Sequence, residues 1–337
     1  MLLVGDKKSP RDLESLKGEA VRCVFPEEQV RFLKENNLTR VGKLIPWDSI
    51  ERRNVGFLIA AIEGYDTIIS IDDDNFATVD DFVRGHTLGY VGHWPKVSSG
   101  NRWINVCKAL RFDPRSLAQV IYSRGYPYSK RFRGDTFVVS GQVRGKVVLN
   151  EGLWLGNPDV DAITNLVAQV KVVGARRERL AAKAHHFLTI NTQNTSFLRK
   201  ILPAMYDVHM GCRLDGWRIG RYDDIWMGMF AKKIIDHMGD VVTFGPPLTE
   251  HRRNPHDLFT DLRAEYWGMV LTERLMKFVE NITVTGNSYA DSYIDLAGSL
   301  AMLNRKGRLG SEHVVVKYLG GLFQRMSVWA EETDRLL

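Results

Sequence analysis

The first 71 residues alternate short β-branched runs with helical patterns, and this alternation constrains the fold more than any other feature of the sequence. The segments "LLVG", "TRVGKLI" and "TIISI" are typical of strands. The segments "PEEQVRFLKENN", which begins at Pro26, and "ERRNVGFLIAAIEG" are typical of helices. Strands that alternate with helices form a parallel sheet with crossover connections. The sequence therefore predicts an α/β fold with a mostly parallel sheet.

The pattern changes after this segment. Residues from about 85 to 160 fall into Gly- and aromatic-rich pieces, which indicate loops and short strands around a site. The run "GRYDDIWMGMFAKKIIDHMG" predicts a helix that ends at Gly239, and "VVTFG" predicts a buried strand. From about Leu258 the chain is largely helical, and its last run is amphipathic. We expect a main domain over residues 1–265 and a helical extension over residues 266–337, which packs either on that domain or in a homo-oligomer.

Composition narrows the class of partner. The net charge of +6 favours an anionic ligand, and the cations are spread along the chain, so a small phosphorylated ligand fits better than nucleic acid. No window approaches the ~20 continuous apolar residues that cross a bilayer, and no membrane partner is expected. The three cysteines show no C-x-x-C spacing and are expected to be reduced thiols. We expect a cytoplasmic protein.

Acidic side chains follow two of the predicted strands. Asp6 comes after "LLVG", and Asp72, Asp73 and Asp74 come directly after "TIISI". The carboxyl ends of parallel strands meet at one edge of a sheet, where ligands bind. Clustered carboxylates suit Mg²⁺ or Mn²⁺, and such a metal neutralises a diphosphate. A solvated acidic turn is the alternative, but the apolar run that leads into the triplet favours the metal site.

A second acidic pair, Asp223 and Asp224, opens the helical run in "GRYDDIW". Acids are favoured in the first turn of a helix whether or not they take part in chemistry. For Asp223 a capping role and a functional role are therefore equally supported, whereas for Asp224 a functional role is favoured. His251, in "TEHRRNPHD", either completes a metal site whose other ligands are carboxylates or has a structural role.

Three further residues are candidate ligand contacts. Arg53 and Asn54 open a helix in "ERRNVGF", where backbone N–H groups favour an anion, although a solvated helix start explains them nearly as well. Trp154 either stacks on a sugar or base or belongs to the core, as aromatics in a β-rich region usually do.

The loop "YSRGYPYSKRFRG" places Arg124 and Arg131 on either side of a Gly-Tyr-Pro-Tyr segment, with more cations behind. On composition alone, a basic loop of this kind holds a phosphate. Gly125 and Pro127 set the backbone of a tight loop that aims Arg124, and Arg131 returns to the site at its far end.

Four motifs in this order, "IDDDNF", "SRGYPYSKR", "GLWLGNPDVDAITNL" and "GRYDDIWMG", make the sequence resemble the UDP-arabinopyranose mutase family, the plant reversibly glycosylated polypeptides. The similarity extends from about Gly64 to Met269. It implies a glycosyltransferase-A-like, Rossmann-type fold with the C-terminal helical extension, a divalent metal (Mn²⁺ or Mg²⁺) at the aspartate triplet, and no flavin. The family interconverts pyranose and furanose forms of a nucleotide sugar.

The resemblance also assigns residues. The arginine that becomes reversibly glycosylated in the family falls on Arg124, and Arg131 matches the second arginine of the segment, while Asn194 and His251 match as well. The front of the chain is different, because it starts at what looks like the family's second strand. A bacterial stand-alone relative from nucleoside-antibiotic biosynthesis is similar in this respect and acts on GDP-sugars. This similarity favours a GDP-sugar such as GDP-fucose over UDP-arabinose.

Ring contraction requires a nucleophile that can donate a lone pair to C1 of the sugar, so that the ring oxygen can depart. Nitrogen can do this, and the hypothesis is that Arg124 is the transient nucleophile and a nearby carboxylate such as Asp224 accepts its proton, while Arg131 and the metal hold the diphosphate. A diphosphate clamp is the alternative role for Arg124, because arginine is normally a cation. For the whole protein, the alternatives are a metal-dependent glycosyltransferase that passes the sugar to an acceptor, and a non-catalytic, self-glycosylated scaffold.

Overall fold

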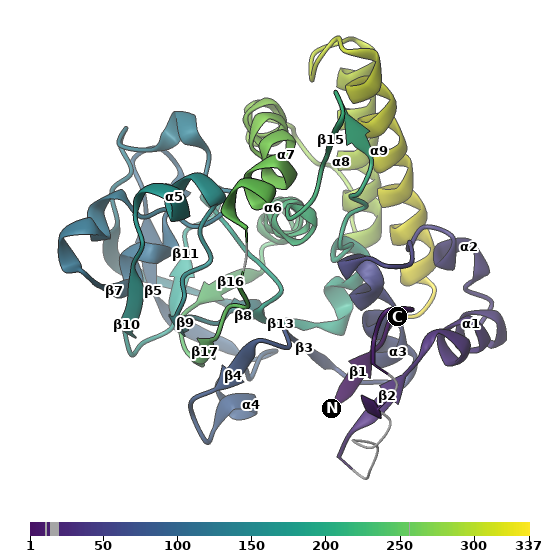
Figure 1. Cartoon of the computed structure of the whole chain (residues 1–337), viewed down its shortest axis with the longest axis horizontal. Coiled ribbons are helices and arrows are strands. Elements are labelled where there is room, and N and C mark those ends of the chain that lie inside the picture. Colours follow the sequence, from purple (N-terminus) through teal and green to yellow (C-terminus); the bar gives the residue numbers. More distant parts are fainter. Residues whose placement is uncertain (11, 14–19, 256) are drawn as a thin grey trace.

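The computed structural model describes residues 1–10, 12–13, 20–255 and 257–337 (Figure 1). Its helices are α1 (Pro26–Glu35), α2 (Thr39–Gly42), α3 (Arg53–Ile62), α4 (Phe82–Gly85), α5 (Ala162–Val167), α6 (Asp223–His237), α7 (Leu258–Val279), α8 (Tyr289–Arg305) and α9 (His313–Asp334). None of the described helices is both long and apolar enough to cross a lipid bilayer.

The described strands are short, with the exceptions of β5 and β8. They are β1 (Leu2–Val4), β2 (Arg22–Val24), β3 (Thr67–Ile71), β4 (Asn75–Ala77), β5 (Val91–Ser98), β6 (Trp103–Ile104), β7 (Leu110–Asp113), β8 (Val138–Glu151), β9 (Trp154–Gly156), β10 (Lys171–Ala175), β11 (Leu180–Ala182), β12 (Phe187–Leu188), β13 (Asn194–Leu198), β14 (Arg213–Leu214), β15 (Trp217–Arg218), β16 (Val241–Phe244) and β17 (Thr249–His251).

Two larger sheets organise the described part of the chain. One has the order β16-β11-β5-β8-β13-β3 and the other β4-β17-β9-β10-β7. The described chain passes directly from a strand of the first sheet to one of the second at three places, between β3 and β4, between β8 and β9, and between β16 and β17. Because these crossings lie side by side, the segments that connect the strands meet where the two sheets join. Asp72, Asp73 and Asp74 form one of these connections.

The predicted α/β fold with C-terminal helices is confirmed, but the sheets are mixed. Within the first sheet β11 pairs in parallel with β5 and β16 with β8, whereas β3, β13, β8 and β5 pair in antiparallel fashion. The expectation of a mostly parallel sheet came from the first 71 residues. The strand that pairs with β3 is β13, which lies more than a hundred residues later and runs in the opposite direction.

The local predictions near the N-terminus are largely confirmed. Strands β1 and β3 and helices α1 and α3 lie where the pattern placed them, and Pro26 is the first residue of α1. The prediction of a strand at "TRVGKLI" is wrong, because Thr39–Gly42 forms helix α2. The parallel partner of β1 is instead β2, whose three residues "RCV" are too few for a periodic pattern.

The C-terminal helices belong to the same core as the sheets. The expected boundary between residues 265 and 266 falls inside α7, and Trp226 of α6 donates a hydrogen bond to Thr272 of α7 at 2.8 Å. Helix α9 returns along the molecule to the N-terminal region, where Arg325 donates to the carbonyl oxygen of Leu44 at 2.8 Å (Figure 1). Of the two places predicted for the amphipathic last helix, the structure shows the packing on the main domain.

Candidate active site

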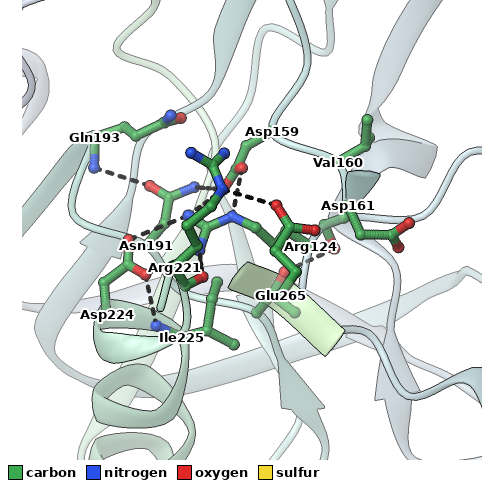
Figure 2. A network of polar contacts seen from close by, with 12 residues as sticks. Arg124, Asp159, Val160, Asp161, Asn191, Gln193, Arg221, Asp224, Ile225 and Glu265 are labelled. Carbon is green, nitrogen blue, oxygen red and sulfur yellow. Dashed lines mark hydrogen bonds and ion pairs between the residues drawn. The ribbon is translucent and has the colours of Figure 1, made fainter. Parts of the chain in front are cut away.

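Arg124 is buried, with 6% of its surface exposed, and its guanidinium contacts the carboxylates of Asp159 and Asp224 (Figure 2). Its Nε and Nη2 donate to the two carboxylate oxygens of Asp159 at 2.8 and 3.1 Å. Its Nη1 and Nη2 donate to the carboxylate oxygens of Asp224 at 3.2 and 3.4 Å, and Nη1 also donates to the carbonyl oxygen of Arg221. Each of the five N–H groups of this guanidinium therefore has a protein acceptor.

The electrostatics of this group hold Arg124 as a cation. Burial lowers the pKa of Arg124, but the charges of Asp159 and Asp224 more than offset this effect and raise its pKa well above the ordinary value. Burial alone would raise the pKa of Asp159, yet the Arg124 guanidinium brings it below its usual range. Two carboxylates around one guanidinium leave this trio with a net negative charge.

The arginine loop and the "PDVD" turn are bound to each other along their backbones. Ser123 forms an isolated antiparallel bridge with Val160, and the backbone N–H of Arg124 donates to the carbonyl oxygen of Asp159 at 3.0 Å. The next acid of the turn, Asp161, pairs with Arg131. The two arginines therefore each meet one of two aspartates that lie two residues apart.

Arg131 is held by stacking as well as by charge. Its guanidinium carbon lies 3.7 Å from the centre of the Tyr128 ring and 5.1 Å from that of Tyr122. The same Tyr128 donates a hydrogen bond to Asp161 at 2.8 Å, and Asp161 also caps α5 by accepting from the Thr164 N–H at 2.8 Å. The structure thus places Arg131 against α5, with its charge already paired.

Gly125 allows this loop to press against α6. Its φ of +85° is in the left-handed region, and a Cβ at this position would lie 2.2 Å from Cγ2 of Ile225. Ile225 directly follows Asp224, so the close packing of Gly125 brings Arg124 to that carboxylate. The predicted tight loop is what the structure shows.

The two acids of "GRYDDIW" lie in the first turn of α6 but have different surroundings. Asp224 faces Arg124 and also accepts from the backbone N–H of Thr192 at 3.2 Å. Asp223 is buried and lies near Asp207 and Glu51; burial, together with the charge of Asp224, raises its pKa to about 7. Of the two acids, the one adjacent to the arginine is Asp224.

Of the four residues predicted to bind a metal, the structure brings together only His251 and Asp74. Nε2 of His251 lies 3.3 Å from Oδ2 of Asp74, and Nδ1 donates to the carbonyl oxygen of Asn157 at 2.8 Å, which leaves Nε2 for a metal or for Asp74. Asp72 instead pairs with Arg53, and Asp73 is exposed. Among the described residues, no three His, Cys, Asp or Glu side chains are placed so that protein ligands alone would hold a metal.

A pocket of about 660 Å³ opens beside His251 and carries several positive charges. It is lined by Thr78, Leu155, Gly156, Asn157, Lys171, Val172, Glu250, His251, Arg252 and Arg253. Lys171 donates to the neutral amide oxygen of Asn157 at 2.5 Å, whereas Arg252 pairs with Glu250 and Arg253 with Asp261. A cavity with three cations beside a His–Asp pair suits an anionic ligand such as a diphosphate.

Asp6 and Asp72 approach the two ends of the same short segment. Asp6 accepts from the backbone N–H of Ser49 at 2.9 Å, just before α3, and Asp72 accepts from Arg53, the first residue of α3, at 2.8 Å. The strands that precede them, β1 and β3, belong to different sheets, so the two acids do not lie at one edge of a single sheet as expected. Arg53 also lies 3.3 Å from Asp207, so two carboxylates balance the cation that was predicted to hold an anion.

Three residues that were predicted to contact a ligand are buried and contact the protein itself. Asn54 is fully buried and exchanges two hydrogen bonds with the backbone of Asp207, at 2.8 and 3.0 Å. Asn194 donates to the carbonyl oxygens of Leu153 and Pro247 and bonds His86 with its own oxygen, so it ties together the connections between the sheets. Trp154 is 1% exposed, which is incompatible with stacking on a ligand at the surface.

Sequence reasoning missed Asp159 and Glu265. Asp159 lies in the quoted "GNPDVDAITNL" stretch, and two acids two residues apart, matched to two arginines, are the signal that could have identified it. Glu265, at 2.8 Å from Nε of Arg221, had no such signal because it lies in an ordinary helical run. Its side chain and those of Arg124 and Asp159 lie in one polar network (Figure 2).

Comparison with known proteins agrees with the motifs. The family model "Reversibly glycosylated polypeptide" matches residues 27–333. A maize protein named "Probable UDP-arabinopyranose mutase 1" is 33% identical over 225 residues, and the Arabidopsis "UDP-arabinopyranose mutase 3" is 34% identical over 228 residues. Each alignment covers 64% of this chain and 54% of the relative, so the chain spans about half the length of these relatives. Because the family model covers nearly the whole chain, this protein belongs to the reversibly glycosylated polypeptide family.

Proposed function

We propose that this protein interconverts the pyranose and furanose forms of a nucleotide sugar, with Arg124 as the group that transiently carries the sugar. Membership of the family and the names of its relatives support the reaction class. The single observation that supports the role of Arg124 is its position between Asp159 and Asp224, which supplies two carboxylates as proton acceptors within hydrogen-bond distance.

The same observation disfavours the alternative role of a diphosphate clamp. All five N–H groups of Arg124 already have protein acceptors, and the surrounding carboxylates make the trio negative. A diphosphate would have to displace one of these carboxylates and approach a site of like charge. The cations that line the pocket beside His251 suit that ligand better.

The chemistry can be written as a balanced exchange at C1 of the sugar. A carboxylate, Asp159 or Asp224, takes a proton from Arg124, whose nitrogen forms a bond to C1 as the bond from C1 to the diphosphate oxygen breaks. The other carboxylate takes the proton that remains on this nitrogen, whose lone pair then expels the ring oxygen. The ring oxygen takes the proton from the first carboxylate and leaves as a hydroxyl, so the ring opens. A different sugar hydroxyl closes on C1 and gives its proton to the first carboxylate; the diphosphate then returns to C1 as the bond to nitrogen breaks, and both protons go back from the two carboxylates to the guanidine.

This scheme must overcome the strong preference of Arg124 for its charged form. The ion pairs that raise its pKa also place the acceptors in contact with the proton, so the transfer needs no movement of the arginine. Bringing the reacting groups into contact before reaction is a large part of what an active site contributes. Arg131, with its charge paired to Asp161, is proposed to hold the loop and to face the departing group.

We propose a divalent metal, Mn²⁺ or Mg²⁺, at Asp74 and His251, with Asp72 and Asp73 beside them. The imidazole and carboxylate are ligands that Mn²⁺ accepts, and the remaining positions would go to water and diphosphate oxygens. When bound, such a metal neutralises charge that develops on the diphosphate. Loss of the ligand pair in His251→Ala should weaken Mn²⁺ binding in calorimetry.

For the nucleotide we propose GDP, with GDP-fucose as the example, and UDP-arabinopyranose as the competing substrate. The relatives' names point to UDP-arabinopyranose. The proposal of GDP rests on the front of the chain, where strand β1 and Asp6 lie outside the family match, which begins at residue 27. Both sugars are therefore supplied in the test.

Incubation with GDP-fucose or UDP-arabinopyranose and Mn²⁺, without an acceptor, tests the reaction class. Formation of the furanose isomer, followed by chromatography and NMR, is the result expected for a mutase. Release of the diphosphate only when an acceptor alcohol is added would identify a glycosyltransferase instead. A stable sugar adduct on the protein without any isomer would identify a self-glycosylated scaffold.

A further inference from the structure

Glu265 of α7 connects the two segments that hold the arginines. Its side chain is fully buried, and its two carboxylate oxygens have different partners. Oε1 accepts from Nε of Arg221 at 2.8 Å, and Oε2 accepts from the backbone N–H of Ala162 at 2.7 Å. A buried carboxylate that accepts one hydrogen bond from each of two segments is fixed in place by both and in turn fixes them.

The first segment is the "PDVD" turn. Ala162 is the first residue of α5 and directly follows Asp161, so Glu265 and Asp161 together satisfy N–H groups at the start of that helix. Because the same turn carries Asp159, a shift of Ala162 would move the carboxylates that face Arg124 and Arg131. The position of both acids is therefore tied to α7.

The second segment is the turn before α6. Arg221 has a φ of +59°, which is uncommon for a residue other than glycine, and its carbonyl oxygen is an acceptor for Arg124. The side chain of Arg221 is anchored by Glu265, and its Nη1 lies 3.7 Å from Asp261, one turn earlier on α7. The anchored side chain holds this residue in the conformation that aims its carbonyl at Arg124.

We propose that Glu265 is a positioning residue: it holds Arg124, Asp159 and the Arg221 carbonyl in register, and it does not contact the substrate. The inference rests on the proposed function for its consequence, but the structural link can be tested without any substrate. Misplacement by about 1 Å from a distant substitution can cost about 10²-fold in rate. Glu265 does not line the pocket beside His251, and Arg253 of that pocket joins the network through Asp261 and not through Glu265, so substrate binding should change little.

The test is Glu265→Gln, which keeps the volume but replaces one acceptor oxygen by a donor. With whichever of GDP-fucose and UDP-arabinopyranose the wild type converts, kcat should fall at least tenfold while KM stays within about threefold. The matched control is Glu312→Gln. Glu312 directly precedes α9 and pairs with Arg274, which lies on α7 as Glu265 does. Both residues are far from Arg124 and Arg131 in sequence, so this variant should retain wild-type kcat. Equal kcat in Glu265→Gln and wild type would overturn the proposal.

Hydrogen exchange measured by mass spectrometry keeps the proposal testable if the wild type converts neither sugar. In Glu265→Gln, amides in peptides that cover residues 157–164 and 219–224 should exchange at least tenfold faster, while those of β8 stay unchanged. Unchanged exchange in both peptides would refute the link. Faster exchange throughout the protein, with a large fall in melting temperature, would show a general structural role and would also refute it. Absence of furanose product in the wild type would count against the proposed function alone.

Discussion

The guanidinium of Arg124 is buried and is paired with two carboxylates, those of Asp159 and Asp224. An arginine that binds a substrate phosphate keeps donors available for it, but here the protein occupies all of them. Asp159 makes the closer, bidentate contact and is therefore the first candidate for the proton acceptor. At this scale the structure adds Asp159 to the sequence-based hypothesis, which had given Asp224 as its example of a nearby carboxylate.

Asp159→Asn tests that assignment. The amide keeps the shape of the side chain but cannot accept a proton from Arg124, so furanose formation should fall by about 10²- to 10⁴-fold, the usual contribution of a positioned base. The control is Asp135→Asn, which removes an acid that directly follows the arginine loop and pairs with Lys108 instead of Arg124. Rates within threefold of wild type for Asp159→Asn would show that Asp159 does not take the proton.

At the scale of elements, the loop of Arg124 depends on its contact with α6. Gly125→Ala should destabilise the fold, because the added methyl meets Ile225 and the residue must keep a φ of +85°. Gly216 has a similar φ of +79° and nothing within 4 Å of the same methyl, so Gly216→Ala isolates the backbone strain. That control should cost about 1 kcal/mol in urea unfolding, and Gly125→Ala should cost at least about 2 kcal/mol more.

Similar losses of stability in the two alanine variants would contradict the close packing of Gly125 on α6. A second outcome bears on function. The Gly125→Ala protein that does fold should show reduced furanose formation, since the loop can no longer bring Arg124 to Asp224. Full activity with reduced stability would separate the packing from the chemistry.

The starts of α3 and α6 meet in a group of buried acids. Burial raises the pKa of Glu51 to about 8 and that of Asp223 to about 7, with the charges of Asp223 and Asp224, respectively, adding to the effect. Burial likewise raises the pKa of Asp207 well above its usual range, although Arg53 opposes this. In the unfolded chain these carboxyls have lost their protons by neutral pH.

Stability should therefore fall as the pH rises. The folded state holds protons that the unfolded chain has released, so the free energy of unfolding decreases by up to about 1.4 kcal/mol per pH unit for each group until the pH passes its folded pKa. The melting temperature should drop between pH 6.5 and about 8.5, and less steeply in Glu51→Gln. Burial lowers the pKa of His86 and His209 to about 4, so these histidines change the pH dependence of stability only below pH 6.5. Equal melting temperatures at both ends of the window would contradict the protonated acids.

How far the sequence predicts elements depends on whether their signal is local. Helices α1, α3, α6 and α9 have long periodic patterns or clear terminal signals, including Gly239 with its φ of +73° after α6, and were predicted from them. The partners of the strands were not, because β3 pairs with β13 and β1 with the three-residue β2. Pairing between distant segments leaves no trace in the periodicity of either one.

The residues of the candidate site differ in the same way, because some have a local sequence signal and others are identified only by the packing of distant segments. Arg124 and Asp224 could be proposed from motifs, and the structure brings them together. Asn54 and Asn194 have the composition of ligand contacts, but their amides bond to backbone groups of distant segments. Glu265 lies in a helix that the sequence assigned to the boundary of an extension, and only the packing of α7 shows that it reaches the arginines.

At the scale of the whole molecule, the C-terminal helices are part of the single core. Trp329 of α9 is completely buried, stacks on Tyr206 with ring centres 5.4 Å apart, and donates to the carbonyl oxygen of Leu202 at 3.0 Å. Trp329→Ala should cost about 3–5 kcal/mol in urea unfolding. The exposed Phe259, replaced by Ala, is the control and should change stability by less than about 0.5 kcal/mol. A loss of less than about 1 kcal/mol for Trp329→Ala would show that α9 is an appendage.

The integrity of this core explains how an arginine from one loop, aspartates from a second loop and a helix, and a glutamate from α7 share one network. The account depends most on the claim that Arg124 carries the sugar. The direct measurement is mass spectrometry of peptides from protein quenched during turnover with the nucleotide sugar that it converts. The account predicts a hexose- or pentose-sized mass increase on the peptide with Arg124, and neither adduct nor furanose product in Arg124→Lys. Furanose formation at the wild-type rate in Arg124→Lys would contradict it.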